Sequence, residues 1–492
     1  MPPLPDSTPS PLSLKQRLSF RAKSAYGMGT ALEMWGFWLY PGVAYGVFNI
    51  FLKVDPRYVG LALMLIRIFD AFSDPICGWL SDNTRSRFGR RRPYILGAGI
   101  ASGVMLPVLF AVSPDWGGSQ FMGLPVLFLW MLLTNLVYIP IISAFSMPFN
   151  SLGAEMSPDY NERTSVMTYR SAMQKLFEVG NFYALRFTNL SWFMLPAIVT
   201  ENGETIQQKD TLLGIQVYTL ILGAIMVVFA IYMFTTLKER YYHVVEERQK
   251  KITFWDSFRG TLGCKPYRIM LWFGLAFSIA NSMVGGLGYY CTVYYVCGGD
   301  SVKGDNWNFY MGLGYMALGF LGPQVLSLVS KRYGKKTAII TACCVGIASF
   351  AGTWVLYNPA APYLQVLASG MIAFSCSAIW MLHSAIGADI VDYDELHTGQ
   401  RREGGFASFG SWILKFGNAL GQGATGFILA YVGFDAAKTA QSAETIFGIR
   451  FMLAAIPVVG LIAAIGFALT FPLSKAKVLE IRQELEERRG TV

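Results

Sequence analysis

Two carboxylates lie four residues apart inside an apolar stretch of the sequence. Asp70 and Asp74 share one face if this stretch is a helix, because residues at i and i+4 lie above one another. An acidic side chain in a membrane helix costs roughly 2.5–3.5 kcal/mol, and two ionised carboxylates at this spacing repel each other. The pair therefore requires a compensating cation. Three candidates fit: a bound Na⁺, a proton shared by the carboxylates, or a permanent partner such as Arg67 or Lys415.

A lysine near the C-terminus is the natural counter-charge. Lys415 lies in an apolar segment, and its amine could attract or release a cation at the acidic pair. The Lys415 side chain could instead extend its amine toward the membrane surface, because Arg402, which precedes the apolar segment, is close to it in the sequence. For Asp70 and Asp74 the alternative is a structural ion pair at a helix end. The functional interpretation is favoured because Asp70 lies well inside the apolar span and Ser73 adds a hydroxyl beside the carboxylates.

Membrane-spanning helices must position these side chains. Of the 492 residues, 53% are hydrophobic and only 14% are charged, whereas a globular protein has roughly 25% charged residues. A helix that crosses the bilayer needs about 20 apolar residues, so the chain has room for roughly twelve. This composition excludes an ordinary soluble domain. The apolar segments fall at about 26–52, 57–80, 94–113, 124–150, 166–189, 213–236, 268–297, 306–330, 337–357, 362–387, 404–430 and 446–471.

Two of these segments are amphipathic rather than uniformly apolar, and such helices need a wet interior to face. Segment 166–189 carries Arg170, Gln174, Lys175, Glu178 and Asn181. Segment 404–430 carries Ser408, Ser411, Lys415 and Asn418.

Basic residues gather in alternate loops. They precede the first segment and follow the second and the eighth, whereas intervening loops such as 114–123 and 190–212 hold few. Cytoplasmic loops carry the excess of Lys and Arg in membrane proteins, so both termini are expected in the cytoplasm. The same rule accounts for the net charge of +9, and we expect no nucleic-acid partner.

The segments divide into two halves of six. A charged stretch from Lys238 to Arg268 separates them, and the basic turn at 87–91 has a counterpart at 332–336. This is the layout of the major facilitator fold, an all-α membrane architecture with twelve transmembrane helices in two pseudo-symmetric six-helix halves. We expect an N-terminal tail at 1–25, six-helix bundles at 26–236 and 268–472, a cytoplasmic central loop at 237–267 and a C-terminal tail at 473–492.

The sequence carries no pattern for catalysis. There is no nucleophile–base constellation, no metal-binding cysteine spacing and no ATP-binding phosphate loop. We therefore expect a transporter and not an enzyme, with no cofactor apart from the coupling ion, Na⁺ or H⁺. Transport must then draw on an ion gradient.

Several motifs resemble those of a known family. They are Asp-Ala-Phe-Ser-Asp-Pro at 70–75, Gly-Trp at 78–79, the loop at 84–90, Val-Asp-Tyr-Asp-Glu at 391–395 and Lys-Phe-Gly at 415–417. Together they resemble the melibiose-permease-like glycoside-pentoside-hexuronide:cation symporter family of the major facilitator superfamily. The similarity runs over nearly the whole chain. It implies cation-coupled symport of a sugar, glycoside or uronide by alternating access.

The resemblance also implies roles for individual residues. The cation, Na⁺ if the protein is sodium-coupled, would bind at Asp70 and Asp74, with Ser143 as a hydroxyl ligand and Lys415 near by. The substrate pocket would comprise Glu33, Arg67, Ser146, Asn150, Arg170, Trp380, His383 and Ser411. An aromatic such as Trp380 can stack on a pyranose while polar groups bind its hydroxyls.

A cytoplasmic gate is implied at the inner ends of the fourth and tenth helices. It would comprise Arg163, after the fourth helix, and Asp389, Asp392, Glu395 and Arg401, after the tenth. Ion pairs that exist in only one state would bias the equilibrium between inward-open and outward-open forms. The alternative is ordinary solvated loop charge.

Three positions depart from the family pattern. Glu33-Met34 replaces a Lys-Asp pair, Ser146 replaces an acidic sugar ligand, and Ser73 replaces an Asn between the paired aspartates. The first two changes argue against melibiose as the substrate. The third weakens the case for Na⁺ over H⁺, because a hydroxyl is a poorer ligand for a hard cation than an amide carbonyl.

The alternative cargo is a lysolipid or another amphiphile. Lysolipid transporters resemble this family too and share the two aspartates, and a pocket with Arg67, Arg170, Glu33 and His383 would also suit a zwitterionic head group. With either cargo we expect a monomer that spans the bilayer of a bacterial inner (plasma) membrane.

Overall fold

The computed structural model describes residues 18–84, 86–156, 160–199, 205–238, 262–399 and 403–489. These residues form twelve long helical rods, close to the positions of the twelve apolar segments. The first half contains a first helix in four parts (α2 Phe20–Met34, η1 Trp35–Leu39, α3 Tyr40–Ala44 and η2 Tyr45–Phe51), then α4 Pro56–Asn83, α5 Arg92–Val108, α6 Val126–Glu155, α7 Tyr160–Phe187 and α8 Thr211–Thr236. The second half contains α11 Lys265–Tyr290 continued by η5 Cys291–Val296, then α12 Ser301–Tyr333, α13 Lys335–Leu356, α14 Leu364–Thr398, α15 Glu403–Tyr431 and α16 Ala443–Thr470, followed by α17 Lys475–Arg489.

Mean hydropathy accounts for many of these helices. Seven of the described helices are long and apolar enough to cross a membrane on those grounds alone. The rods α4, α7 and α15 are not among them, because side chains such as Arg67, Arg170 and Lys415 interrupt their apolar runs. Lipid cannot solvate these charges, so they must face carboxylate partners inside the bundle.

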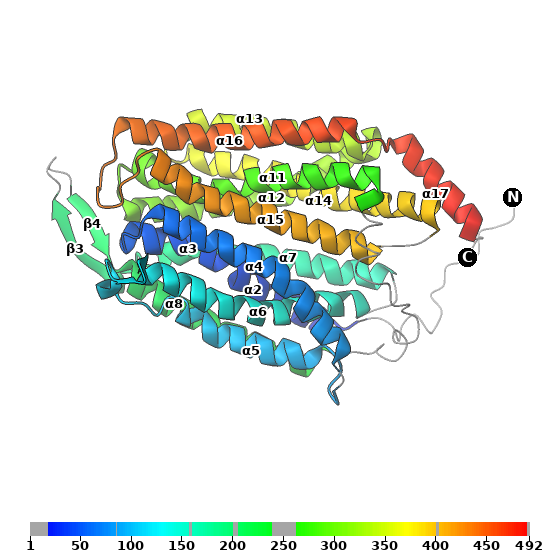
Figure 1. Cartoon of the computed structure of the whole chain (residues 1–492), viewed down its shortest axis with the longest axis horizontal. Coiled ribbons are helices and arrows are strands. Elements are labelled where there is room, and N and C mark those ends of the chain that lie inside the picture. The colour runs from blue at the N-terminus through cyan, green and yellow to red at the C-terminus, as the bar shows by residue number, and fades with distance from the viewer. Residues whose placement is uncertain are drawn as a thin grey trace.

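The helices of each half pack mainly among themselves. In the first half α5 packs against α6 and α8, and α2 against α7, whereas in the second half α12 packs against α14 and α11 against α16. The rods α4 and α15 form the main contact between the halves, and α7 and α12 form a second. Figure 1 shows α13 and α16 along one edge of the bundle and α5 along the opposite edge, with α4 and α15 between them.

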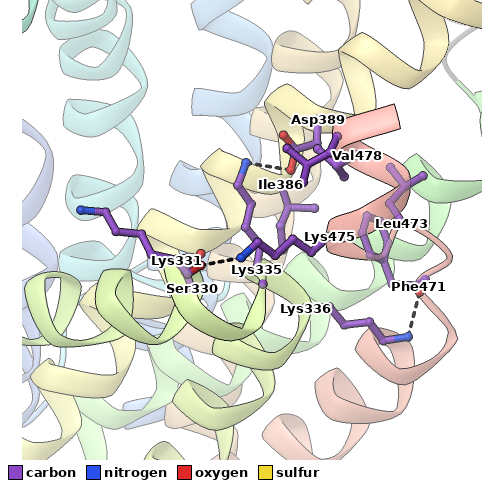
Figure 2. A pocket seen from close by; sticks show the side chains of 12 residues that line it. Ser330, Lys331, Lys335, Lys336, Ile386, Asp389, Phe471, Leu473, Lys475 and Val478 are labelled. Atoms are coloured by element: carbon purple, nitrogen blue, oxygen red, sulfur yellow. Dashed lines mark hydrogen bonds and ion pairs between the residues drawn. The ribbon is translucent and has the colours of Figure 1, made fainter. Parts of the chain in front are cut away.

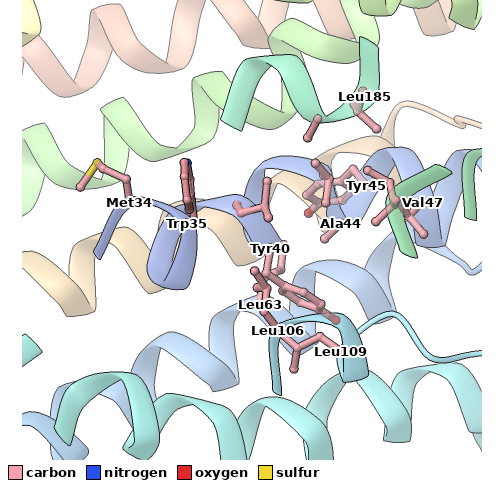
Figure 3. Close-up of a cluster of buried hydrophobic side chains, with 14 of the residues drawn as sticks. Met34, Trp35, Tyr40, Ala44, Tyr45, Val47, Leu63, Leu106, Leu109 and Leu185 are labelled. Carbon is pink, nitrogen blue, oxygen red and sulfur yellow. The ribbon is translucent and has the colours of Figure 1, made fainter. Parts of the chain in front are cut away.

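The first helix is interrupted by two π-helical turns, η1 and η2. Such turns occur frequently at functional sites. Trp35 anchors η1, because its Nε1 donates a hydrogen bond of 3.0 Å to the carbonyl of Phe177 on α7. Figure 3 shows Trp35, Tyr40 and Tyr45 along this helix, with Leu106 of α5 below it. Buried side chains therefore hold the first helix between α5 and α7.

Contacts between the halves close one end of the bundle. The hydroxyl of Tyr45 donates to the carbonyl of Gln422 at 3.1 Å, and Tyr290 forms a buried hydrogen bond with Asn49. Glycines let α4 and α15 approach here: a Cβ added at Gly426 would lie 2.1 Å from the carbonyl oxygen of a residue on α4.

A β-hairpin lies at this closed end, in the range 190–212 that we had treated as a loop. Strand β3 Met194–Val199 pairs antiparallel with β4 Thr205–Lys209. Lys209 forms a buried ion pair with Asp305 of α12, and Asp305 also accepts a hydrogen bond of 2.7 Å from Tyr289. The hairpin thus ties the first half to the second, and Figure 1 shows it at the end opposite α17. The other short elements are η3 Pro114–Trp116, β1 Gln120–Phe121, β2 Leu124–Pro125 and η4 Ser191–Phe193.

The bounds of several helices differ from the apolar segments. Helix α14 continues to Thr398, so Asp389, Asp392 and Glu395 lie on the helix and not after it. An apolar pattern marks the part of a helix that faces lipid. It misses this extension, because a helix can continue into water on its own backbone hydrogen bonds. The α2 helix begins before residue 26, and α17 occupies much of the C-terminal tail. Residues 239–261 of the central loop lie outside the described residues.

The close approach of α4 to α15 leads to a test of the closed end. Gly426→Val should force the two helices apart, because the new side chain meets the backbone of α4 within 2.1 Å. A cysteine introduced at Met64, which packs against Gly423, should then react faster with a membrane-impermeant thiol reagent in a background without other cysteines. Gly466→Val is the matched control, because its Cβ meets no atom within 4 Å. Equal labelling in Gly426→Val and its parent would show that this contact does not keep the end closed.

Candidate functional site

Helix α4 presents two carboxylates on one face, and α15 supplies an amine to both. Lys415 Nζ lies 2.9 Å from Asp70 Oδ1 and also forms an ion pair with Asp74. The Asp70 side chain is 1% exposed and that of Lys415 is 22% exposed. Buried ions of opposite charge compensate each other for the loss of water, so the three groups form a unit.

Arg67, one turn earlier on α4, contacts Asp70 of the acidic pair. Its Nη1 lies 3.4 Å from Asp70 Oδ2, and its Nη2 donates to the carbonyl of Phe37 in η1 at 2.6 Å. The guanidinium also stacks over the ring of Trp38, with its carbon 4.8 Å from the ring centroid. Both permanent partners considered from the sequence, Arg67 and Lys415, therefore contact Asp70.

Two serine hydroxyls lie beside the acidic pair. Ser73 Oγ donates to the carbonyl of Asp70 at 3.1 Å, and it lies 3.2 Å from Ser143 Oγ of α6. Both side chains are buried. The structure thus brings Ser143 to the site through Ser73. Together, Asp70, Asp74, Ser73, Ser143 and Lys415 form what we call the acidic site.

Four polar residues of the first half form a second group, the Glu33 cluster: Glu33 of α2, Ser146 and Asn150 of α6, and Arg170 of α7. Glu33 Oε1 accepts from Ser146 Oγ at 2.8 Å and from Asn150 Nδ2 at 2.7 Å. Glu33 Oε2 lies 2.8 Å from Arg170 Nη2, which also bonds to Asn150. Every member therefore has a partner in another member of the cluster.

The first helix positions the acidic site and the Glu33 cluster relative to each other. Glu33 and Phe37 are four residues apart, so they lie about one turn from each other. Glu33 binds Arg170, whereas the Phe37 carbonyl binds Arg67, which contacts Asp70. A shift of this helix would therefore move contacts of both groups.

The predicted substrate residues of the second half lie apart from the Glu33 cluster. Trp380 of α14 packs edge-on against Phe277 of α11 at 5.3 Å between ring centroids. His383 Nε2 lies 3.3 Å from the carbonyl of Met270, also on α11. Ser411 of α15 is exposed. Among the described residues, no hydrogen bond or ring contact joins these three side chains to the Glu33 cluster.

Three of the predicted gate residues, Asp389, Asp392 and Glu395, lie on the part of α14 near α17. Asp389 Oδ2 lies 2.7 Å from Nζ of Lys335, a partner that the sequence analysis had not assigned. Asp392 and Glu395 follow on the same helix, α14. Arg401 and the side chain of Arg163 lie outside what the structure describes.

Sequence reasoning also missed a charged pair on α7. Lys175 Nζ lies 2.7 Å from Glu178 Oε2 and 5.6 Å from the ring centroid of Tyr315 on α12. The polar face of segment 166–189 contained the signal, since i,i+3 charges meet on a helix. The pair thus lies where α7 meets α12, at the second contact between the halves.

Comparisons with known proteins agree with this architecture. The putative glycoside/cation symporter YagG of Escherichia coli (strain K12) is 26% identical, over 96% of this chain and 96% of its own. Sodium-dependent lysophosphatidylcholine symporter 1 of Mus musculus is 23% identical, over 96% of this chain and 90% of its own. A bacterial homologue of the human lysosomal transporter spinster, solved in an inward-facing and unoccupied conformation, matches 96% of this chain and 98% of its own with a TM-score of 0.64 and 13% identity.

The structural match confirms the major facilitator fold that the sequence predicted. Residues 26–475 match the family described as MFS/sugar transport protein. This family transports solutes and is not enzymatic. Because the match covers most of the sequence, the chain belongs to this family of cation symporters of the major facilitator superfamily, the group that includes glycoside-pentoside-hexuronide transporters.

Proposed function

We propose that this chain moves a sugar, glycoside or uronide together with Na⁺ or H⁺ by alternating access, with the cation bound at Asp70 and Asp74. The observation that carries the proposal is the contact of Lys415 with both carboxylates across the two halves. The ammonium supplies the positive charge that buried carboxylates require. A coupling cation that binds these carboxylates competes with the amine.

This competition couples cation binding to conformational change. The acidic pair belongs to α4 of the first half and Lys415 to α15 of the second. When Na⁺ or H⁺ neutralises the carboxylates, Lys415 loses its partners and the α4–α15 contact weakens. A ligand shifts a conformational equilibrium by the difference in its affinity for the two states. The cation therefore favours rearrangement of the two halves, which is what symport requires.

The Glu33 cluster is the proposed core of the substrate pocket. It offers a carboxylate, a hydroxyl, an amide and a guanidinium, which are the donors and acceptors that bind sugar hydroxyls. Because these groups bond to one another, a sugar must replace their mutual bonds with bonds of its own. Arg67 borders this pocket, and Trp380, His383 and Ser411 complete it from the second half when the halves rearrange.

A lysolipid is the second candidate cargo, and one observation favours it. The mouse relative that covers nearly the whole chain is named as a lysophosphatidylcholine symporter. In that case Arg170 would bind the phosphate and Glu33 the quaternary amine of the head group. Uptake into proteoliposomes decides between the cargoes. A panel of sugars, uronides and lysolipids is offered with an imposed Na⁺ or H⁺ gradient and without one.

The proposal includes an inner gate and an orientation. The gate comprises Arg163, Asp389, Asp392, Glu395 and Arg401. The Lys335–Asp389 pair supports ion pairing at this end of the molecule. The basic turns at 87–91 and 332–336 favour a cytoplasmic location for this end and for both termini of a monomer in a bacterial inner membrane.

Neutralising the carboxylates tests the cation site. Asp70→Asn and Asp74→Asn should each abolish gradient-driven accumulation and leave measurable substrate binding, because the charge is lost while the Glu33 cluster stays intact. Asp55→Asn is the control, since Asp55 begins the same helix but pairs with the exposed Arg57 at 2.7 Å. Concentrative uptake at the parental rate in either site variant would exclude these carboxylates as the coupling site.

Replacing Trp380 of α14 tests whether the second half contributes to the substrate pocket. Trp380→Ala should weaken sugar binding by about 2- to 13-fold, because a stacked aromatic contributes roughly 0.5–1.5 kcal/mol beyond its buried area. Affinity is measured by calorimetry and stability by thermal unfolding. Trp272→Ala is the matched control, because Trp272 of α11 is 56% exposed on the outside of the bundle. Unchanged affinity with a lowered melting temperature would show that Trp380 only packs against Phe277.

A further inference from the structure

A cavity lined by lysines lies at the α17 end of the bundle, apart from the acidic site and the Glu33 cluster; it shares only Asp389 with the proposed gate. It has a volume of about 220 Å³ and lies where the α12–α13 turn, α14 and the link between α16 and α17 meet. Figure 2 shows its lining side chains, among them the paired Lys335 and Asp389. The lining also includes apolar side chains such as Leu473 and Val478. The lysines of the cavity are Lys331, Lys335, Lys336 and Lys475.

The cavity carries surplus positive charge. Asp389 is the one carboxylate in its lining, and Lys335 Nζ lies 2.7 Å from it. In the described part of the chain, no carboxylate forms an ion pair with Lys331, Lys336 or Lys475. Three lysines of the lining therefore have no compensating carboxylate among the described residues, and Figure 2 shows that the Lys331 side chain extends away from the other lining side chains.

Backbone carbonyls orient two of these ammonium groups. Lys336 Nζ donates to the carbonyl of Phe471 at 2.8 Å, and Lys475 Nζ donates to the carbonyl of Lys331 at 2.7 Å. A carbonyl accepts a hydrogen bond but does not neutralise the charge of the donor. The Lys475 contact thus holds the start of α17 to α12, and the Lys336 contact holds α13 to the end of α16, so both ammonium groups keep their charge while they hold these helices together.

The cavity lies at the edge of the apolar surface of the bundle. Leu328 of α12 is 64% exposed and Leu469 of α16 is 60% exposed. Exposed leucines on long apolar helices mark the part of the surface that acyl chains cover. Lysines directly beside that surface lie at the depth of the lipid head groups.

We propose that this cavity binds the phosphate of an anionic phospholipid, whose acyl chains lie along α12 and α16. Basic pockets between membrane helices on the cytoplasmic side bind anionic head groups. A lipid fits better than free phosphate, because the lining is apolar as well as cationic. Lys331 can turn its ammonium toward the phosphate, since its side chain has no hydrogen bond in the described chain. The bound lipid holds the α12–α13 turn against α17.

Native mass spectrometry of the full chain, stripped of lipid in detergent, tests this site. The protein is titrated with phosphatidylglycerol or phosphatidylcholine, and we expect the anionic lipid to bind more tightly. Lys331→Gln with Lys475→Gln should weaken phosphatidylglycerol binding by about 30-fold, because each lysine beside an anionic head group contributes about 1 kcal/mol. Lys477→Gln is the matched control: it lies on α17 but pairs with Glu480 at 2.9 Å and does not line the cavity.

A single variant keeps the proposal testable if the double variant does not fold. Lys331→Gln removes no side-chain hydrogen bond of the described residues, and it should weaken phosphatidylglycerol binding by about fivefold. Parental affinity in Lys331→Gln, or equal binding of the two lipids by the parent, overturns the proposal. Inorganic phosphate is the third arm. If millimolar phosphate displaces phosphatidylglycerol, the site takes the free anion and the lipid assignment is wrong. None of these outcomes depends on which solute is transported.

Discussion

The arrangement of the two halves depends on the need to pair buried charges. Asp70 and Asp74 cannot face lipid, and among the described residues Lys415 alone brings a cation to both of them from the other half. Removing one partner of a buried ion pair typically costs about 3–5 kcal/mol, because the remaining charge stays desolvated. This requirement makes α4 and α15 neighbours. In the proposed mechanism a cation that neutralises the carboxylates weakens this contact, so one interaction both stabilises the fold and couples it to an ion gradient.

The first helix extends this coupling to the Glu33 cluster. Its π turn places the carbonyl of Phe37 within reach of Arg67, while Glu33 one turn away is bonded to Arg170. Both groups therefore respond to the position of one helix. Trp35 fixes that helix against α7 through the carbonyl of Phe177. The polar groups come from α4, α6, α7, α15 and the first helix itself, and the first helix sets the distance between the acidic site and the Glu33 cluster.

Different interactions hold the two ends of the bundle together. At the hairpin end, glycines allow close backbone contact, and a buried Lys209–Asp305 pair joins the halves. At the α17 end, Lys335 pairs with Asp389 within the second half, and further lysines border the lipid-facing surface. Close packing excludes water and favours a closed state at the first end. Charge at the second end interacts with water, head groups and neighbouring acidic side chains.

Much of the fold and the centre of the candidate site could be predicted from the sequence, because they rest on local properties. Runs of apolar residues predicted all twelve rods, and the basic turns at 87–91 and 332–336 predicted the two halves. The four-residue spacing of Asp70 and Asp74 predicted a shared face and a need for a cation. Other features depend on which helices become neighbours. Examples are the full mutual pairing of the Glu33 cluster and the packing of Trp380 against Phe277.

The paired strands β3 and β4 and the helical extension of α14 to Thr398 were also not predictable. Both lie beyond the apolar spans, where hydropathy carries no information about hydrogen bonding. The sequence by itself determined which residues must leave lipid, because desolvation acts on each charge wherever its helix lies. Only the tertiary structure decided partners such as that of Lys209, since its ion pair with Asp305 joins the two halves and depends on the packing of whole helices.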